Sequence, residues 1–369
     1  MSKLPYGLRW YEIGYLILMG LALYYSGSDF RAHRVPIVGI TPCELYGIVM
    51  AAGVAVLAGR CREQWQVLPN KVLFFVLAVA WVALFAFLGN ATLGYINSPS
   101  LFTWMFDIFT SPLSDEQYGL LIPFAVLALY WWKREQLVAQ PLGLWGPGIL
   151  IVAGALVLHL FGHVLQVTQL STVAFFVGLY GLTGMAWGKN WLKASLFPFF
   201  LLAFCVPPGQ SIDGFTFRLR LLVATIVSGI AHLGLSPDLV REGTQLSDPQ
   251  HTFAYDVAPA CSGIHSLLAL TALTIIYGFV IFKEPWKRAV LVVSSIPLAI
   301  LGNVTRLCFT ITVAELGGQS AGKAVETKFG FLTFAVAIFC MFLIARQLEK
   351  IGVNAGSPGG GKHTGEVAA

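Results

Sequence analysis

The chain has 369 residues, of which 57% are hydrophobic and only 11% are charged, and its mean hydropathy is +0.75. Soluble domains carry about 25% charged residues, so this composition excludes a water-soluble protein of this size. The net charge of +5 is modest. In such a chain it indicates basic loops at a membrane surface rather than nucleic-acid binding.

Apolar stretches of about 20 residues recur along the chain, as they do in transmembrane helices. They predict an all-α polytopic membrane protein with about 8–10 spans. We place the candidate spans at 11–26, 38–59, 72–96, 117–132, 144–166, 171–187, 194–208, 262–282, 289–311 and 329–345. No small-residue cleavage site follows the first span, which favours a retained helix over a signal peptide. The Gly-rich tail 351–369 is predicted to be disordered.

The distribution of Lys and Arg predicts the orientation of these spans, because short cytoplasmic loops collect basic residues. Loops 97–116 and 167–170 contain no Lys or Arg, whereas the alternate loops contain several. Only Arg31 and Arg34 depart from this pattern. With both termini inside, residues 209–261 fall outside the cytoplasm.

We therefore divide the chain into N-terminal spans (1–97) and a membrane core (98–350) that contains the extracytoplasmic segment 209–261. Within this segment, 213–234 begins as an amphipathic helix that could lie along the interface. Residues 239–257 contain two short extended runs around an Asp-Pro turn, which predicts a β-hairpin. Such a hairpin would form a lid or a docking edge at the outer surface.

The stretch PACSGIHSLLAL (259–270) places a cysteine at the start of an apolar helix. A helix N-terminus favours the thiolate of Cys261, and the small neighbours Ser262 and Gly263 would let a substrate backbone approach. His265 follows one helical turn later on the same face. A buried structural thiol and a structural histidine are the competing interpretations. The functional one is a nucleophile at the membrane surface.

Arg306 follows the uncharged run 289–305 and so reaches the outer level predicted for Cys261. It could snorkel to the headgroups, but ionisable residues in spans are also candidate functional sites. Asn303 lies one turn earlier and could orient the guanidinium. Further ionisable residues occur just before the last span: Lys323, Glu326 and Lys328.

The remaining cysteines and histidines do not predict a metal or a cofactor. The six cysteines are scattered without a CxxC pair, so neither a zinc site nor a disulfide framework is indicated. Five of them are interpreted as small apolar core residues. His159 and His163 have helical i, i+4 spacing, but no acidic or Cys partner accompanies them. We therefore expect no metal ion and no cofactor.

The stretch DVAPACSGIHSLLAL, followed about 40 residues later by IPLAILGNVTRL, resembles the exosortase/archaeosortase family. Cys261 matches the A-C-S-G core of that family, and Arg306 matches its N-x-x-R motif. The segments SLFPFFLLAFCVPP and YGLLIPFAVLALYWWKRE also resemble family spans, so that the likeness runs from about residue 100 to 348. These enzymes are proposed to be cysteine transpeptidases.

The chain departs from the family pattern at its third position, where members commonly have a His four residues before a Gly. Here Glu326 stands four residues before Gly330, and no histidine lies between His265 and the tail residue His363. Lys323 or Lys328 could supply positive charge, His265 could act as the base, or Glu326 could orient His265.

The resemblance implies a multi-pass protein of the bacterial inner membrane with its site on the extracytoplasmic face. Its substrates would be exported proteins with a Pro-Glu-Pro-like C-terminal motif, a transmembrane helix and a basic cluster. Cys261 would form an acyl-thioester, Arg306 would stabilise the oxyanion or donate a proton, and a surface acceptor would release the product. The bilayer and exopolysaccharide machinery are the other partners that it implies. The alternative is a transporter or a catalytically weakened scaffold in polysaccharide export.

Overall fold

The computed structural model describes residues 42–92, 98–111, 116–208, 213–235, 239–247, 254–256, 264–328 and 331–354. The chain forms two compact units, Met1–Gln210 and Ser211–Ala369, which we describe separately. The predicted span 11–26, Cys261 and the tail 355–369 lie outside the described residues.

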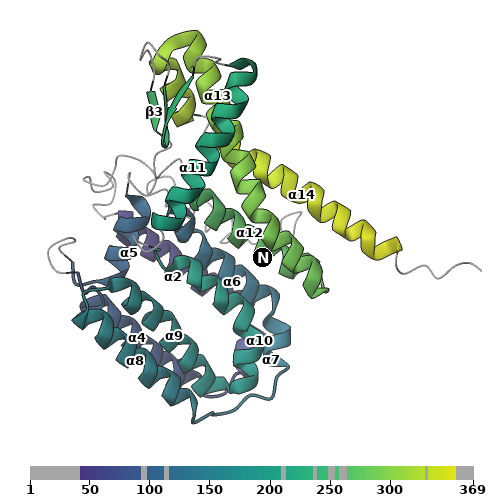
Figure 1. Cartoon of the computed structure of the whole chain (residues 1–369). Helices are drawn as coiled ribbons and strands as arrows, with labels where there is room; N and C mark the ends of the chain where they lie inside the picture. The colour runs from purple at the N-terminus through teal and green to yellow at the C-terminus, as the bar shows by residue number, and fades with distance from the viewer. Residues whose placement is uncertain are drawn as a thin grey trace, which may run out of the picture. The chain divides into compact units, whose positions relative to one another are not determined.

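The first unit is entirely helical in its described part (Figure 1). Its α-helices are α2 (Pro42–Arg60), α3 (Arg62–Val67), α4 (Lys71–Leu88), α5 (Leu101–Thr110), α6 (Ile122–Trp132), α7 (Arg134–Val138), α8 (Gly148–Val164), α9 (Thr168–Trp187) and α10 (Lys189–Phe200). Two 3-10 turns complete it, η2 (Glu116–Leu120) and η3 (Leu201–Cys205).

An aromatic core joins α4, α8 and α9. Phe85 is fully buried, and its ring lies 5.3 Å from the ring of Phe175 and 4.6 Å from that of His159. Trp81 donates a hydrogen bond from Nε1 to the carbonyl of Phe175 at 2.9 Å. Gly178 lets α9 approach α4 closely, because a Cβ atom there would overlap the Trp81 ring. This packing fixes the three helices as a rigid group.

Helix α5 corrects the prediction of a loop over 97–116. The Ser100 side chain caps the helix by accepting from the backbone N–H of Thr103. Leu101, Trp104 and Phe109 are buried. The helix has 10 residues, too few to cross a bilayer, which needs about 20. Its apolar stretch is therefore too short to be predicted as a span.

The second unit combines four α-helices with a small sheet. Its elements are α11 (Asp213–Ile230), the π-helical turn η5 (Ala231–Leu235), β1 (Val240–Glu242), β2 (Gln245–Ser247), β3 (Ala254–Asp256), α12 (Ile264–Ile281), α13 (Pro285–Lys328) and α14 (Phe331–Asn354).

The predicted β-hairpin is confirmed and carries one additional strand. Strands β2 and β3 pair antiparallel, with Leu246 opposite Tyr255. Strand β1 pairs antiparallel with β2 across a turn at Gly243, whose φ of 63° is the left-handed conformation that glycine adopts readily. The first extended run therefore folds back on itself, which the Asp-Pro turn alone did not predict.

Helix α13 is the long axis of the second unit (Figure 1). It has 44 residues and bends at Gly318, whose φ is 74°. Residues 285–317 would extend about 50 Å, well beyond the roughly 30 Å of a bilayer core. About 20 Å of this helix can therefore project beyond the bilayer core.

The amphipathic segment predicted at 213–234 forms α11 and η5, and its apolar face packs against α13. Val223, Ala224 and Val227 are buried in one cluster with Leu307 and Ile311. Protein contacts thus cover the side of α11 that carries these residues, whereas Phe217 and Leu222 are exposed.

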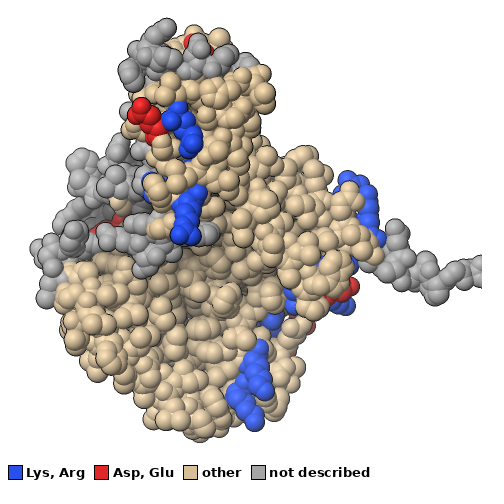
Figure 2. Space-filling view, in the orientation of Figure 1, with Lys and Arg blue, Asp and Glu red and all other residues tan. Residues whose placement is uncertain are grey.

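The helical content and the long apolar helices confirm an all-α polytopic membrane protein. Among the described residues, four helices are long and apolar enough to cross a membrane: Cys43–Arg60, Lys71–Leu88, Thr168–Trp187 and Pro285–Gly322. Shorter apolar helices are Leu101–Thr110, Tyr118–Trp132, Gly148–Val164 and Leu267–Ile281. On the face shown in Figure 2, charged side chains occupy only a few places.

Candidate functional site

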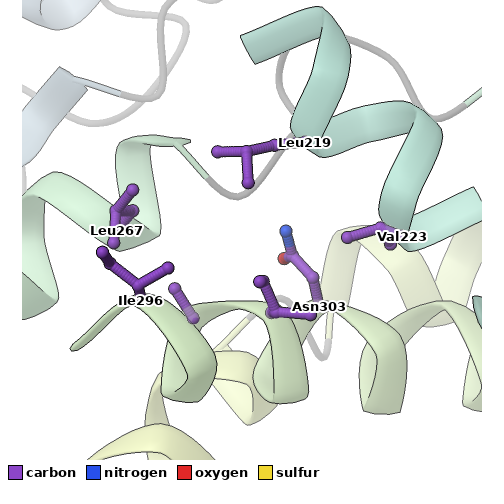
Figure 3. A pocket seen from close by; sticks show the side chains of 7 residues that line it. Leu219, Val223, Leu267, Ile296 and Asn303 are labelled. Atoms are coloured by element: carbon purple, nitrogen blue, oxygen red, sulfur yellow. The ribbon is translucent and has the colours of Figure 1, made fainter. Parts of the chain in front are cut away.

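Helices α11, α12 and α13 meet at a small cavity in the second unit (Figure 3). It is lined by Leu219, Val223, Leu267, Ile296, Ala299, Ile300 and Asn303. Its volume is about 10 Å³, which is room for about one water molecule. Asn303 is the polar member of this lining, and its amide points toward Leu219 of α11. Asn303 is only 2% exposed.

Arg306 lies one turn beyond Asn303 on the same side of α13. Its guanidinium atoms Nε and Nη2 are buried and have no hydrogen-bond partner among the described residues. The same holds for Oγ1 of Thr310, one turn further along. A buried donor left without a partner costs about 1–3 kcal/mol. The Arg306 turn therefore carries buried polar groups that the described residues do not satisfy.

A second arginine, Arg220 of α11, shows the same feature. Its Nε is buried without a hydrogen-bond partner in the described part of the chain, and its guanidinium lies 5.6 Å from the ring of Phe217. The adjacent Leu219 lines the cavity with Asn303. Sequence reasoning missed Arg220, although an arginine in the apolar run FRLRLLV was a signal. No feature of the sequence indicated that Thr310 would have a buried, unsatisfied hydroxyl.

The position of the candidate nucleophile stays a prediction. Cys261 lies outside the described residues, and α12 begins three residues later at Ile264. His265 is the second residue of this helix. Leu267, in the same first turn, lines the cavity together with Asn303. The beginning of α12 and the turn of α13 before Arg306 therefore meet at one place.

Glu326 lies elsewhere along α13, in segment 319–328 beyond the bend at Gly318. Gln319 in this segment donates from Nε2 to the carbonyl of Ala254 at 3.5 Å, which connects it to β3. The segment also contains Lys323 and Lys328. The roles of Glu326 and His265 stay predictions.

A hydrogen bond and apolar packing hold α12 against α13. Oγ1 of Thr271 lies 2.9 Å from Oγ of the buried Ser295. Leu270, Leu291 and Met341 are almost fully buried in the cluster that joins α12, α13 and α14. These contacts fix the register of α12 against α13, the helix that carries the N-x-x-R motif.

The other cysteines show no features of a reactive site. Cys205 is fully buried, whereas Cys43, Cys61, Cys308 and Cys340 are half-buried, and all five are free thiols. Most of them pack beside hydrophobic clusters. Their environments suit small apolar residues better than nucleophiles.

The histidine pair of α8 is explained by packing. His159 Nδ1 lies 3.0 Å from the hydroxyl of Ser171, and the rings of His159 and His163 are 5.9 Å apart. No group of three or more potential metal ligands occurs among the described residues.

Comparison with known proteins gives the same family as the sequence motifs. The family model described as transmembrane exosortase matches residues 110–343, which is more than half of the chain. No curated protein and no solved structure gives a significant match. The matched region contains α6 to α13 and most of α14, and with them both the A-C-S-G and the N-x-x-R motifs. The chain therefore belongs to the transmembrane exosortase family.

Proposed function

We propose that the protein is a membrane cysteine peptidase or transpeptidase that cleaves the C-terminal sorting signal of exported proteins. One observation carries this proposal. The first turn of α12, just after Cys261, lines the same cavity as Asn303, one turn before Arg306. The buried, unpartnered N–H groups of Arg306 can stabilise negative charge there.

In the first step, the Cys261 sulfur attacks the carbonyl carbon of the scissile peptide bond. A C–S bond forms, and the carbonyl oxygen becomes an oxyanion that Arg306 stabilises. The C–N bond then breaks, and the amine leaves with a proton. The product is an acyl-thioester on Cys261.

In the second step, an acceptor amine or hydroxyl at the surface attacks the thioester carbonyl. The C–S bond breaks, the thiolate is regenerated, and the exported protein is joined to the acceptor. Water in place of the acceptor gives hydrolysis. His265 or Glu326 would accept and return the protons.

The positions of the basic residues along α13 and α14 support an extracytoplasmic site. Arg346 and Lys350 occur at the end of α14, and Lys287 and Arg288 occur at the beginning of α13, near Lys283. The Arg306 turn lies about 27–30 Å further along α13, by the rise of an α-helix. The positive-inside rule then assigns this turn to the outer surface.

The experiment is co-expression with a tagged exported protein that carries a C-terminal motif, a transmembrane helix and a basic cluster. We expect cleavage by the wild type and by Cys205→Ala, and none by Cys261→Ala. Cleavage by Cys261→Ala at the wild-type rate would contradict the proposal. Alternatively, a transporter or scaffold would leave the tag intact in all three strains.

A further inference from the structure

Helix α11 contains two arginines whose surroundings differ. Arg218 is exposed, whereas Arg220 is half-buried. The residues that follow Arg220 by three, four and seven positions share its face of the helix. They are buried in the cluster that includes residues of α13: Val223, Ala224 and Val227. Arg220 therefore belongs to the side of α11 that packs against α13, and Arg218 lies on the opposite side.

The Arg220 guanidinium has no counter-ion in the described part of the chain. Its Nε is buried without a hydrogen-bond partner, and it forms no ion pair with an Asp or Glu of that part. Arginine keeps its charge in proteins, so loss of a proton cannot relieve the burial. A partly buried cation without a partner is costly, and a bound anion would offset this cost.

The tip of the Arg220 side chain is the part that a ligand can reach. Its Cζ lies 5.6 Å from the centre of the Phe217 ring, and Phe217 is 48% exposed. The guanidinium therefore approaches the accessible surface at this ring, although Nε at its base is buried. The exposed ring adds an apolar surface beside the cation.

This guanidinium is close to the site proposed for cleavage. Leu219 and Val223, which flank Arg220 in the chain, line the small cavity together with Asn303 (Figure 3). Arg306 follows Asn303 by three residues, about 4.5 Å along the axis of α13. An extended peptide advances about 3.3 Å per residue. A substrate with its scissile carbonyl at Arg306 therefore has residues within reach of Arg220 a few positions away.

The surroundings of Arg220 favour a carboxylate of a peptide as the ligand. A guanidinium binds a carboxylate through two charge-assisted hydrogen bonds in parallel. Peptide substrates supply carboxylates from Asp and Glu side chains. A lipid phosphate would instead meet the exposed Arg218, because exposed arginines extend to the headgroups. Arg220 faces α13.

We propose that Arg220 is a specificity-determining residue that binds the carboxylate of an acidic side chain in the substrate. The acidic residue lies in the extended segment ahead of the substrate's transmembrane helix, within a few positions of the bond that Cys261 attacks. Phe217 packs against the methylene groups of the same side chain. Arg220 touches none of the reacting atoms, so it acts on substrate binding. This inference rests on the proposed function.

Cleavage kinetics of the full-length protein with two reporters test the inference. The reporters are tagged exported proteins that differ only by Glu or Gln at the acidic position ahead of the transmembrane helix. Wild type should cleave the Glu reporter with a kcat/KM about 10–100-fold higher, the range of a hydrogen bond to a charged group, and mainly through a lower KM. Arg220→Met should lose this preference and cleave both reporters as wild type cleaves the Gln reporter.

Matched variants separate this role from a general one. Arg218→Met makes the same change on the exposed side of α11 and should keep the preference. Arg220→Lys keeps the charge without the bidentate geometry and should keep part of it. If Arg220→Met does not fold, Arg220→Gln replaces it.

Two kinds of failure are distinguishable. Cleavage of either reporter by Cys261→Ala at the wild-type rate would contradict the proposed function, and with it this inference. Equal cleavage of the two reporters by wild type, dependent on Cys261, would overturn this inference alone. An equal loss of cleavage with both reporters in Arg220→Met would also overturn it, because a structural or lipid contact does not distinguish Glu from Gln.

Discussion

The two units treat their buried polar groups differently. In the first unit, Asn90 Oδ1 accepts from the hydroxyls of Thr92 and Thr168 at 2.7 and 3.1 Å, and Asn90 Nδ2 donates to the carbonyl of Ser98. In the second unit, Arg220, Arg306 and Thr310 have buried polar atoms without a partner among the described residues. The described residues satisfy the buried polar groups of the first network, whereas they leave these atoms of the second unit without a partner.

One buried donor in the described part of the first unit departs from this pattern. Trp191 is the residue there whose buried nitrogen has no partner in the described part of the chain, and it lines an apolar groove. Buried donors usually have partners.

Among the substitutions that test this difference between the two units, the largest effect is expected at Arg306. Arg306→Met should lower substrate cleavage about 10²–10³-fold, as the loss of an oxyanion donor does. The melting temperature should not fall, because the variant removes buried groups that lack partners. Arg288→Met, on the same helix, is the control and should cleave normally. Normal cleavage by Arg306→Met would contradict the account.

Asn90→Ala should have the opposite effects, with a loss of stability and no loss of cleavage. It leaves the hydroxyls of Thr92 and Thr168 without their acceptor and should lower the free energy of unfolding by about 2–3 kcal/mol. Thermal unfolding in detergent measures this, with the exposed Gln136→Ala as the control. The specific activity of the folded fraction should stay unchanged. A loss of activity without a loss of stability would break the comparison.

A smaller effect is expected at the contact between α12 and α13. Thr271→Val keeps the shape of the side chain but removes its hydrogen bond to Ser295, at a cost of about 1 kcal/mol. Because this bond helps to fix α12 against α13, cleavage should fall severalfold. Thr225→Val on α11, which removes a hydroxyl bonded within its own helix, should have less effect on cleavage.

The smallest effect concerns Glu284, just before α13. Its own backbone N–H, and secondarily Lys287, holds the pKa of this carboxyl below its usual 4.5. A lowered folded-state pKa means that the stabilisation is present above pH 4.5 and is lost as the pH falls through the folded-state pKa. Glu284→Gln should therefore flatten the dependence of the melting temperature on pH in this acidic range. An unchanged slope would show that Glu284 contributes nothing.

Sequence reasoning predicted the spans of the described helices because their apolar stretches are long and uninterrupted. Helix α2 begins at Pro42 where the span was predicted from 38, and α9 begins at Thr168 where it was predicted from 171. Helix α5 was missed because it is short. The packing of α11 against α13 depends on contacts between distant segments, which periodicity does not report.

The roles of the site residues and the outer depth of Arg306 stay predictions, whereas the motifs identified the family. The cavity shared by Leu267 and Asn303 required the pairing of α12 with α13. Arg220 was missed because its helix was interpreted as an isolated amphipathic segment. Its burial depends on the neighbouring helices.

The most direct test of the central claim is to trap the covalent intermediate. Purified protein is incubated briefly with a sorting-signal substrate, quenched in acid and digested for mass spectrometry. The account predicts a substrate acyl group on the peptide that contains Cys261, removable by hydroxylamine and absent from Cys261→Ala. Substrate cleavage with no adduct on Cys261, or with an adduct on another residue, would contradict it.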